Sequence, residues 1–315
     1  MLNRRHLRIK VLQSLYAFFQ SDKKDMLASE KEMFGAIERI YDLYLSLLMT
    51  FGELRSKGEH RIEENKKKML PTDDDLNPNR KFVDNKVIDI LENQPELRSQ
   101  SELRKINWLG AEEQEIFRKM YFQIRESETY FEFMNNEEQG FEEDVNFAVQ
   151  LFKNEIANFP LLYDYYEEKS IHWMDDIDLA CSMVIKTIKG FEEEGDNKIL
   201  PLYKPDDDEK DFIRDLFRQT IAKSKENLKL IDELTQNWEL DRIAKMDVIL
   251  MEMAITELQV FKNIPKKVTL NEYIEISKFY STPKSNVFIN GVLDKAIERL
   301  EKDNKIQKIG RGLMK

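Results

Sequence analysis

The scarcity of glycine and proline is the feature that most limits what this chain can fold into. Only 10 glycines and 8 prolines occur among 315 residues, whereas an average protein has about 12% of the two together. Turns are therefore few, and apolar residues recur at spacings of three and four between charged residues. We find no sustained alternation of apolar and polar residues that would indicate a strand. The sequence predicts an all-α fold.

Composition also bears on the class of protein. No apolar run approaches the roughly 20 residues of a membrane span, and the single cysteine, Cys181, excludes an internal disulfide framework or a multi-cysteine metal site. The start MLNRRHLRIKVLQSLYAFF lacks a small-residue cleavage site, so we interpret it as mature sequence. We expect a cytoplasmic protein. A net charge of -11 argues against nucleic-acid binding over the whole surface, so such a site must be local.

Helical patterns and two polar breaks organise the chain. Helices are expected over about 2–20 and 29–54, and the charge-dense segment KGEHRIEENKKKMLPTDDDLNPNRKF, residues 57–82, is expected to be a loop or linker. Further helices are expected over 86–91, 112–125, 142–159, 161–169 and 178–191. A second break, EEEGDNKILPLYKPDDDEKD, precedes C-terminal helices that run from about 206 to 299.

The middle of the chain shows an internal sequence similarity to its C-terminal part. Aromatic, apolar and acidic residues between Phe147 and Ile188 match residues between Phe212 and Met253 at a constant offset of 65, including Trp173 with Trp238. A degenerate duplication would produce this match. Two amphipathic helices of similar length would produce it as well, and both interpretations stay open.

The first helix changes from apolar to basic toward its N-terminus. On a helical wheel Arg5 and Arg8 share the stripe of Leu12 and Tyr16, and Arg4 lies at its edge. Because buried arginines are rare, we expect the first two turns to extend beyond the core and present guanidinium groups to an anion. The alternative is a frayed, solvated helix start.

Residues 238–300 contain three short helical patterns. Thr269 and Glu272 have the spacing of a capping box, and Ser285 or Asn286 is expected to cap the last helix. That helix reads KSNVFINGVLDKA, with Gly291 inside it at a cost of about 1 kcal/mol relative to alanine. Either another helix packs closely against Gly291, or the surface around Phe288 receives an external ligand, such as an unpaired base that stacks on an aromatic ring.

These segments together resemble the NusB family of bacterial transcription antitermination factors. The resemblance rests on RRHLRIKVLQSLYAF, NWELDRIAKMDVILMEMAITEL, IPKKVTLNEYIEISKFYS and SNVFINGVLDKAIERL, in that order. It implies a NusB-like fold of two helical bundles with an additional helical insert. It also implies binding of boxA-type single-stranded RNA together with NusE, a ribosomal small-subunit protein, within the RNA polymerase antitermination complex. We expect residues 1–20 and 206–315 to be NusB-like and residues 21–205 to be the insert.

The resemblance also implies roles for individual residues. The RNA-binding residues would be Arg4, Arg5, Arg8, Lys284, Ser285 and Phe288, and the NusE-facing residues would be Tyr16, Asp241 and Asp247. His6 replaces a position that is often basic in the family, which puts that contact in doubt.

Other functions have weaker support. The spacing of DDEKD, residues 207–211, matches a magnesium-binding aspartate motif, but acids after Pro205 also stabilise a helix N-terminus and no second acid cluster accompanies them. We find no glycine-rich loop, nucleophile elbow or zinc-ligand spacing. We therefore expect no enzymatic activity, no catalytic residue and no metal or other cofactor. A NusB-like domain related to RNA methyltransferases and a protein-interaction scaffold without RNA binding are the remaining alternatives.

Overall fold

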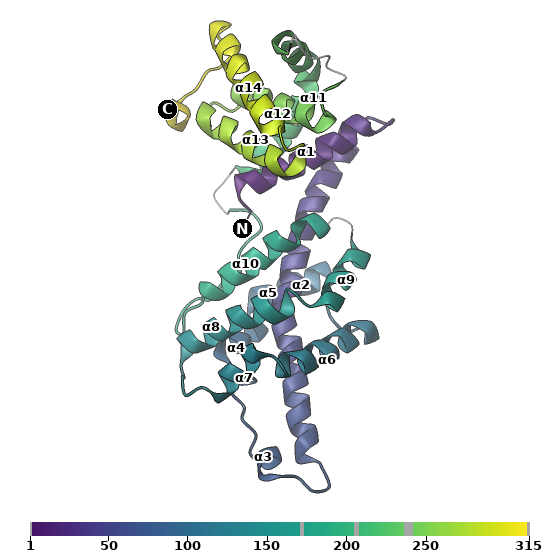
Figure 1. Ribbon diagram of the computed structural model, residues 1–315, viewed down its shortest axis with the longest axis vertical. Helices are drawn as coiled ribbons and strands as arrows, with labels where there is room; N and C mark the ends of the chain where they lie inside the picture. The colour runs from purple at the N-terminus through teal and green to yellow at the C-terminus, as the bar shows by residue number, and fades with distance from the viewer. Residues whose placement is uncertain (1, 171–172, 205–207, 236–241, 314–315) are drawn as a thin grey trace. The chain divides into compact units, whose positions relative to one another are not determined.

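The computed structural model describes residues 2–170, 173–204, 208–235 and 242–313. Within these ranges the regular structure is helical and no strand occurs, which confirms the all-α prediction. The chain divides into two compact units. The first unit comprises Met1–Ala36 and Tyr203–Lys315, and the second comprises Ile37–Leu202. Figure 1 shows the helices of each unit in the colours of the chain.

The first unit is built around one buried helix. Its elements are α1 (Arg4–Gln20), the start of α2 (Met26–Lys66), α11 (Glu209–Leu234), α12 (Lys245–Val260), α13 (Lys266–Tyr280), α14 (Ser285–Lys302) and the 3₁₀ turn η4 (Gly310–Leu313). α12 packs against α1, α11, α13 and α14. Its residues from 249 to 258 are all buried, as expected for a helix that is apolar nearly all round. The two carboxylates in that stretch, Glu252 and Glu257, therefore lie in the core.

Local signals set the ends of the outer helices of this unit. Asn3 caps α1 by accepting a 3.0 Å hydrogen bond from the backbone N–H of His6. Asn304 ends α14 in the left-handed conformation, with φ of 55°. The N–H of Lys305 then donates to the carbonyl of Leu300 at 2.8 Å, which is the closing bond of a Schellman motif. The chain after α14 is thereby turned back.

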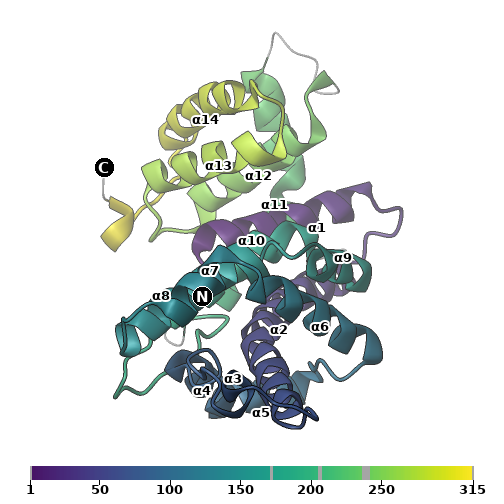
Figure 2. The ribbon, with the colours of Figure 1, turned by 60° about the horizontal axis from the view of Figure 1, so that its bottom comes forward.

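The second unit is a separate helical assembly. It comprises most of α2, then α3 (Asp73–Leu76), α4 (Lys86–Asn93), α5 (Pro95–Arg104), α6 (Ala111–Arg125), α7 (Glu128–Asn135), α8 (Phe141–Leu151), the π-helical turn η1 (Phe152–Ile156), α9 (Pro160–Lys169), η2 (Met174–Asp176) and α10 (Ile177–Lys189). Figure 2 shows these helices around α2. Buried polar groups on α2 are satisfied by neighbouring helices. Tyr44 bonds to Thr187 at 2.6 Å, and the indole N–H of Trp108 donates to the carbonyl of Ser46 at 3.1 Å.

The loop predicted over 57–82 is wrong in its first part, because α2 continues to Lys66. Gly58 lies against the chain where it returns, and a Cβ there would lie 2.8 Å from a methyl group of Val83. Arg55 and Glu59 pair one turn apart at 3.6 Å. Tertiary packing and local ion pairs thus support a helix in a segment whose composition favours a loop.

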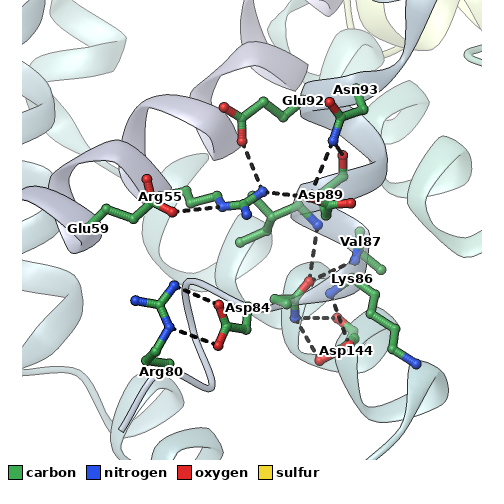
Figure 3. A network of polar contacts seen from close by, with 12 residues as sticks. Arg55, Glu59, Arg80, Asp84, Lys86, Val87, Asp89, Glu92, Asn93 and Asp144 are labelled. Atoms are coloured by element: carbon green, nitrogen blue, oxygen red, sulfur yellow. Dashed lines mark hydrogen bonds and ion pairs between the residues drawn. The ribbon is translucent and has the colours of Figure 1, made fainter. Parts of the chain in front are cut away.

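A polar network in the second unit joins α2, α4 and α8 (Figure 3). Asn85 caps α4 by accepting from the backbone N–H of Val87 at 3.0 Å, and its amide donates to Asp144 on α8 at 3.1 Å. Arg55 on α2 donates to Asp89 on α4 at 3.0 Å. Burial raises the pKa of Asp144. Each side chain named here has at least one partner within the second unit, so we assign the network to the stability of that unit.

Charge divides unequally between the two units. By sequence the first unit has 28 Lys and Arg against 24 Asp and Glu, and the second has 21 against 36. An anionic ligand is therefore attracted to the first unit, which has a net charge of +4, and repelled by the second, which has -15. The predicted domain boundaries and the duplication stay predictions. No helix in the described ranges is long and apolar enough to cross a bilayer.

Candidate nucleic-acid interface

The start of α1 and the turn between α12 and α13 form one groove, which we call the arginine groove. Its volume is about 510 Å³. The lining residues are Asn3, Arg4, Arg5, Arg8, Asn263, Ile264, Pro265, Val268 and Glu272. The three arginines that the sequence singles out thus lie side by side. Their environments differ, and the differences decide which of them can reach a ligand.

Arg8 lies in the core, so the expectation that the first two turns extend beyond it is wrong at this residue. Its side chain is 1% exposed and Glu257 is fully buried. Two hydrogen bonds of 2.7 Å join the Arg8 guanidinium to the Glu257 carboxylate. Thr269 and Tyr273 also donate to that carboxylate, at 2.8 and 3.1 Å. Burial acts to lower the pKa of Arg8, but the attraction of Glu257 outweighs it, and the pKa lies above the usual value.

Arg5 and Arg4 lie at the surface, as expected. Arg5 is 40% exposed and makes bonds of 3.0 and 2.9 Å to the two carboxylate oxygens of Glu272. The hydrogen bonds to Glu272 raise the pKa of Arg5. Arg4 is 35% exposed and donates to Asp208 at 2.7 Å. An exposed pair such as Arg4–Asp208 contributes only about 0 to 1 kcal/mol, so a phosphate can compete for that guanidinium. The Arg5–Glu272 pair is bidentate and half-buried, so Arg5 is held more firmly. Burial lowers the pKa of His6, which does not add a cation here at neutral pH.

The capping box predicted for Thr269 and Glu272 is absent from α13. The helix begins at Lys266, and its N-cap, Pro265, has no side-chain cap. Thr269 therefore lies in the first turn, where its hydroxyl donates to Glu257, while Glu272 holds Arg5. Both residues support the arginines of α1 and not the start of their own helix.

A second pocket lies where α12 begins and the α13–α14 loop passes, and we call it the phenylalanine pocket. Its volume is about 680 Å³. The lining residues are Arg242, Ile243, Ala244, Asp247, Thr282, Lys284, Ser285, Val287 and Phe288. It brings together the three predicted RNA-binding residues of this segment, and it shares no lining residue with the arginine groove. Phe288 is half-buried, Lys284 is exposed and Val287 is 73% exposed.

Ser285 and Asp247 hold this pocket together from inside. Both are buried, at 3% and 4% exposure. The Ser285 hydroxyl donates to Asp247 at 2.6 Å, and Ser281 donates to the other oxygen of the same carboxylate. Neither side chain is exposed, which argues against direct contact of Ser285 with RNA and of Asp247 with NusE, and both roles stay predictions. Ser285 is also not the N-cap of α14, since that position is Lys284.

The remaining NusE-facing candidates are Tyr16 and Asp241. Tyr16 lies on α1 and is 39% exposed. Asp241 lies outside the described residues. Near Tyr16, the end of α1 is tied to the start of α12 by a 2.9 Å bond from Lys245 to Gln20.

Gly291 is exposed on α14, and a Cβ at this position would meet no atom within 4 Å. Close packing of another helix of this chain therefore does not explain the glycine. Of the two interpretations open from the sequence, the one that places an external ligand near this surface stays a prediction.

The aspartate motif at 207–211 has ordinary structural partners where it is described. Asp208 pairs with Arg4, Glu209 is buried and accepts from the backbone N–H of Lys204 at 2.9 Å, and Asp211 pairs with Arg214 at 2.6 Å. Asp207 lies outside the described residues. Over the parts of the chain that the structure describes, no group of three or more His, Cys, Asp or Glu side chains could hold a metal ion.

Sequence reasoning missed Arg242, which lines the phenylalanine pocket, and Glu257, which binds Arg8. Arg242 lies three residues before α12 begins at Lys245, so helical periodicity does not predict which way it faces. Glu257 had a signal, because it is an acid within the otherwise apolar stretch VILMEMAITEL. Such an acid requires a buried cation or hydrogen-bond donors.

Part of this chain is similar to a known protein family. The NusB family model matches residues 178–298. A transcription antitermination protein NusB of Salinibacter ruber is 44% identical over 105 residues, which are 33% of this chain and 66% of that protein. A protein of the same name from Chloroherpeton thalassium is 40% identical over 33% of this chain and 50% of its own length. Another from Natranaerobius thermophilus is 37% identical over 26% of this chain and 62% of its own length.

The chain thus spans between half and two thirds of the length of these curated relatives. No solved structure matches. The matched residues begin within α10 of the second unit and continue through α11, α12 and α13 into α14 of the first. The stretch that matches the NusB family model includes every residue of the phenylalanine pocket.

Proposed function

We propose that the protein is a noncatalytic transcription antitermination factor of the bacterial cytoplasm. Its first unit would bind boxA-type single-stranded RNA together with NusE and join them to RNA polymerase. The phenylalanine pocket is the observation that carries this proposal, because it combines an aromatic ring with Lys284 and Arg242 inside the stretch that matches the NusB family model. An aromatic ring stacks on an unpaired base, and neighbouring cations attract its phosphate.

Two arginines of α1 would add phosphate contacts, and the third would hold them in place. Arg4 can exchange its exposed carboxylate partner for phosphate at little cost. Arg5 is 40% exposed and would contact phosphate beside its bonds to Glu272. Arg8 cannot exchange its partner, because releasing it would leave the Glu257 carboxylate buried without its charge partner, at a cost of about 3 to 5 kcal/mol. We therefore propose Arg4, Arg5, Lys284, Arg242 and Phe288 as RNA contacts and Arg8 as a positioning residue.

NusE would associate beside the exposed Tyr16 on α1. Tyr16→Ala should then reduce the gain in RNA affinity that NusE produces, while RNA binding by the protein alone stays unchanged. A variant that loses RNA affinity also without NusE would indicate that Tyr16 belongs to the RNA site or to the fold.

The test is a titration of the full chain with boxA-like RNA and with scrambled RNA, each with and without NusE, over a series of salt concentrations. Phe288→Ala should weaken boxA binding by about 1 to 3 kcal/mol and leave the salt dependence unchanged, because stacking is not ionic. Phe279→Ala is the matched control, since Phe279 is 80% exposed on α13 and lines neither pocket. Equal affinity for both RNAs with no gain from NusE would refute the proposal and favour a protein-interaction scaffold.

A further inference from the structure

The segment after α14 is docked onto the first unit in a specific way. We call residues 304–313 the tail segment. The backbone N–H of Ile309 donates to the carbonyl of Lys262 at 3.1 Å, and the ammonium group of Lys308 donates to the carbonyl of Phe261 at 2.9 Å. Both acceptors lie in the α12–α13 turn, directly before the residues that line the arginine groove. The ribbons show the tail segment running back from α14 to η4 (Figures 1 and 2).

Two glycines make this docking possible. Gly310 has φ of +51°, a conformation that side chains with a Cβ rarely adopt. At Gly312 a Cβ would lie 2.0 Å from the carbonyl oxygen of Lys262, so only glycine fits. A segment that did not lie in one fixed position would not require glycine at 310 or 312. The tail segment is therefore held in a defined place.

The docked segment has basic residues and no acidic residue of its own. From residue 304 to the end the sequence has four Lys and Arg and no Asp or Glu. Lys262 and Lys308 are joined to an amide and a backbone carbonyl, and Lys267 and Lys305 are exposed. Burial, with a smaller contribution from the charge of Lys266, lowers the pKa of Lys308 to about 8 against the opposing attraction of Glu257. A bound phosphate would raise the pKa of Lys308 again, because an anion favours the charged form of the ammonium group.

We propose that the docked tail segment, with the α12–α13 turn, is a second contact surface for RNA phosphates. Lys262, Lys267, Lys305 and Lys308 would bind the phosphate backbone of single-stranded RNA that continues past the element held at the two pockets. The inference rests on the proposed function and extends it. These contacts would not depend on the RNA sequence, because the four lysines would bind phosphate groups and not base edges.

The experiment compares a short boxA-like RNA with the same RNA extended by a uridine tract at either end, using the full chain. Each phosphate contact on single-stranded RNA changes the slope of log affinity against log salt by about 0.7. One extended RNA should bind with a steeper slope than the short RNA, by about 1.4 for two added contacts. We call the difference between the slopes of the extended and the short RNA the increment. Lys305→Gln/Lys308→Gln should abolish the increment and leave binding of the short RNA unchanged. The control Lys225→Gln/Lys229→Gln removes two exposed charges from α11 and should keep the increment.

Gly312→Val separates position from charge. It should undock the tail segment while preserving every cation, and it should therefore reduce the increment as well. Equal slopes for the short and extended RNAs, or an increment that survives in the Lys305/Lys308 variant, would overturn the inference while the proposed function stands. An increment that survives in Gly312→Val alone would overturn the requirement for docking. Failure of the wild-type chain to bind even the short RNA would overturn both proposals.

Discussion

Replacing Arg8 should destabilise the first unit far more than replacing its neighbour Arg4. Arg8→Met removes both 2.7 Å bonds to Glu257 and leaves a fully buried carboxylate with only Thr269 and Tyr273 as donors. Loss of one partner of a buried pair costs about 3 to 5 kcal/mol. Arg4→Met breaks an exposed pair with Asp208 and should cost less than about 1 kcal/mol.

The double variant Arg8→Met/Glu257→Gln isolates the charge. The amide side chain introduced at position 257 would not be ionised and could still accept from Thr269 and Tyr273, so the double variant should recover at least about 2 kcal/mol of the loss. The comparison of single and double variants measures the coupling between the two side chains directly.

The assay is urea unfolding of the full chain followed by circular dichroism. Because two compact units can unfold separately, hydrogen exchange of α12 amides should assign the affected transition to the first unit. A loss below about 1 kcal/mol for Arg8→Met would refute the reasoning, since the carboxylate would then have to find water or another cation.

Three further changes test other positions. Glu252 has a pKa raised to about 7 by burial, and one of its oxygens has no hydrogen-bond partner among the described residues. Above pH 4.5 the Glu252 carboxyl is ionised in the unfolded state but still protonated in the folded state, so the free energy of unfolding should fall as pH rises toward 7. Glu252→Gln should remove this pH dependence, and urea titrations at pH 8 should show it to be more stable than wild type by about 2 to 3 kcal/mol. Gly291→Ala should raise the unfolding free energy by up to about 1 kcal/mol, because the site is exposed and open; a loss would show that the position is constrained. Arg5→Ala should flatten the salt dependence of RNA binding by about 0.7, whereas an unchanged slope would remove Arg5 from the phosphate contacts.

The sequence by itself determined the fold class and the positions of most helices. Low glycine and proline content and apolar spacing of three and four depend only on neighbours along the chain, and these signals set α1, α6, α12, α13 and α14. The stretch VILMEMAITEL is apolar nearly all round, which is typical of a buried helix, but the central place of α12 was visible only in the structure. The family resemblance followed from the same short segments.

The tertiary structure decided what each polar side chain does. A helical wheel places Arg8 on the apolar stripe of α1, but it cannot reveal a carboxylate 249 residues away that makes burial of the guanidinium favourable. For the same reason Thr269 and Ser285, which look like caps in sequence, serve buried acids from other helices. The glycine at 312 required the tertiary structure as well, because the carbonyl that excludes a side chain belongs to Lys262, across a turn of the fold. Contacts between segments that are distant in sequence determine burial and charge pairing, and the local spacing of apolar residues does not predict those contacts.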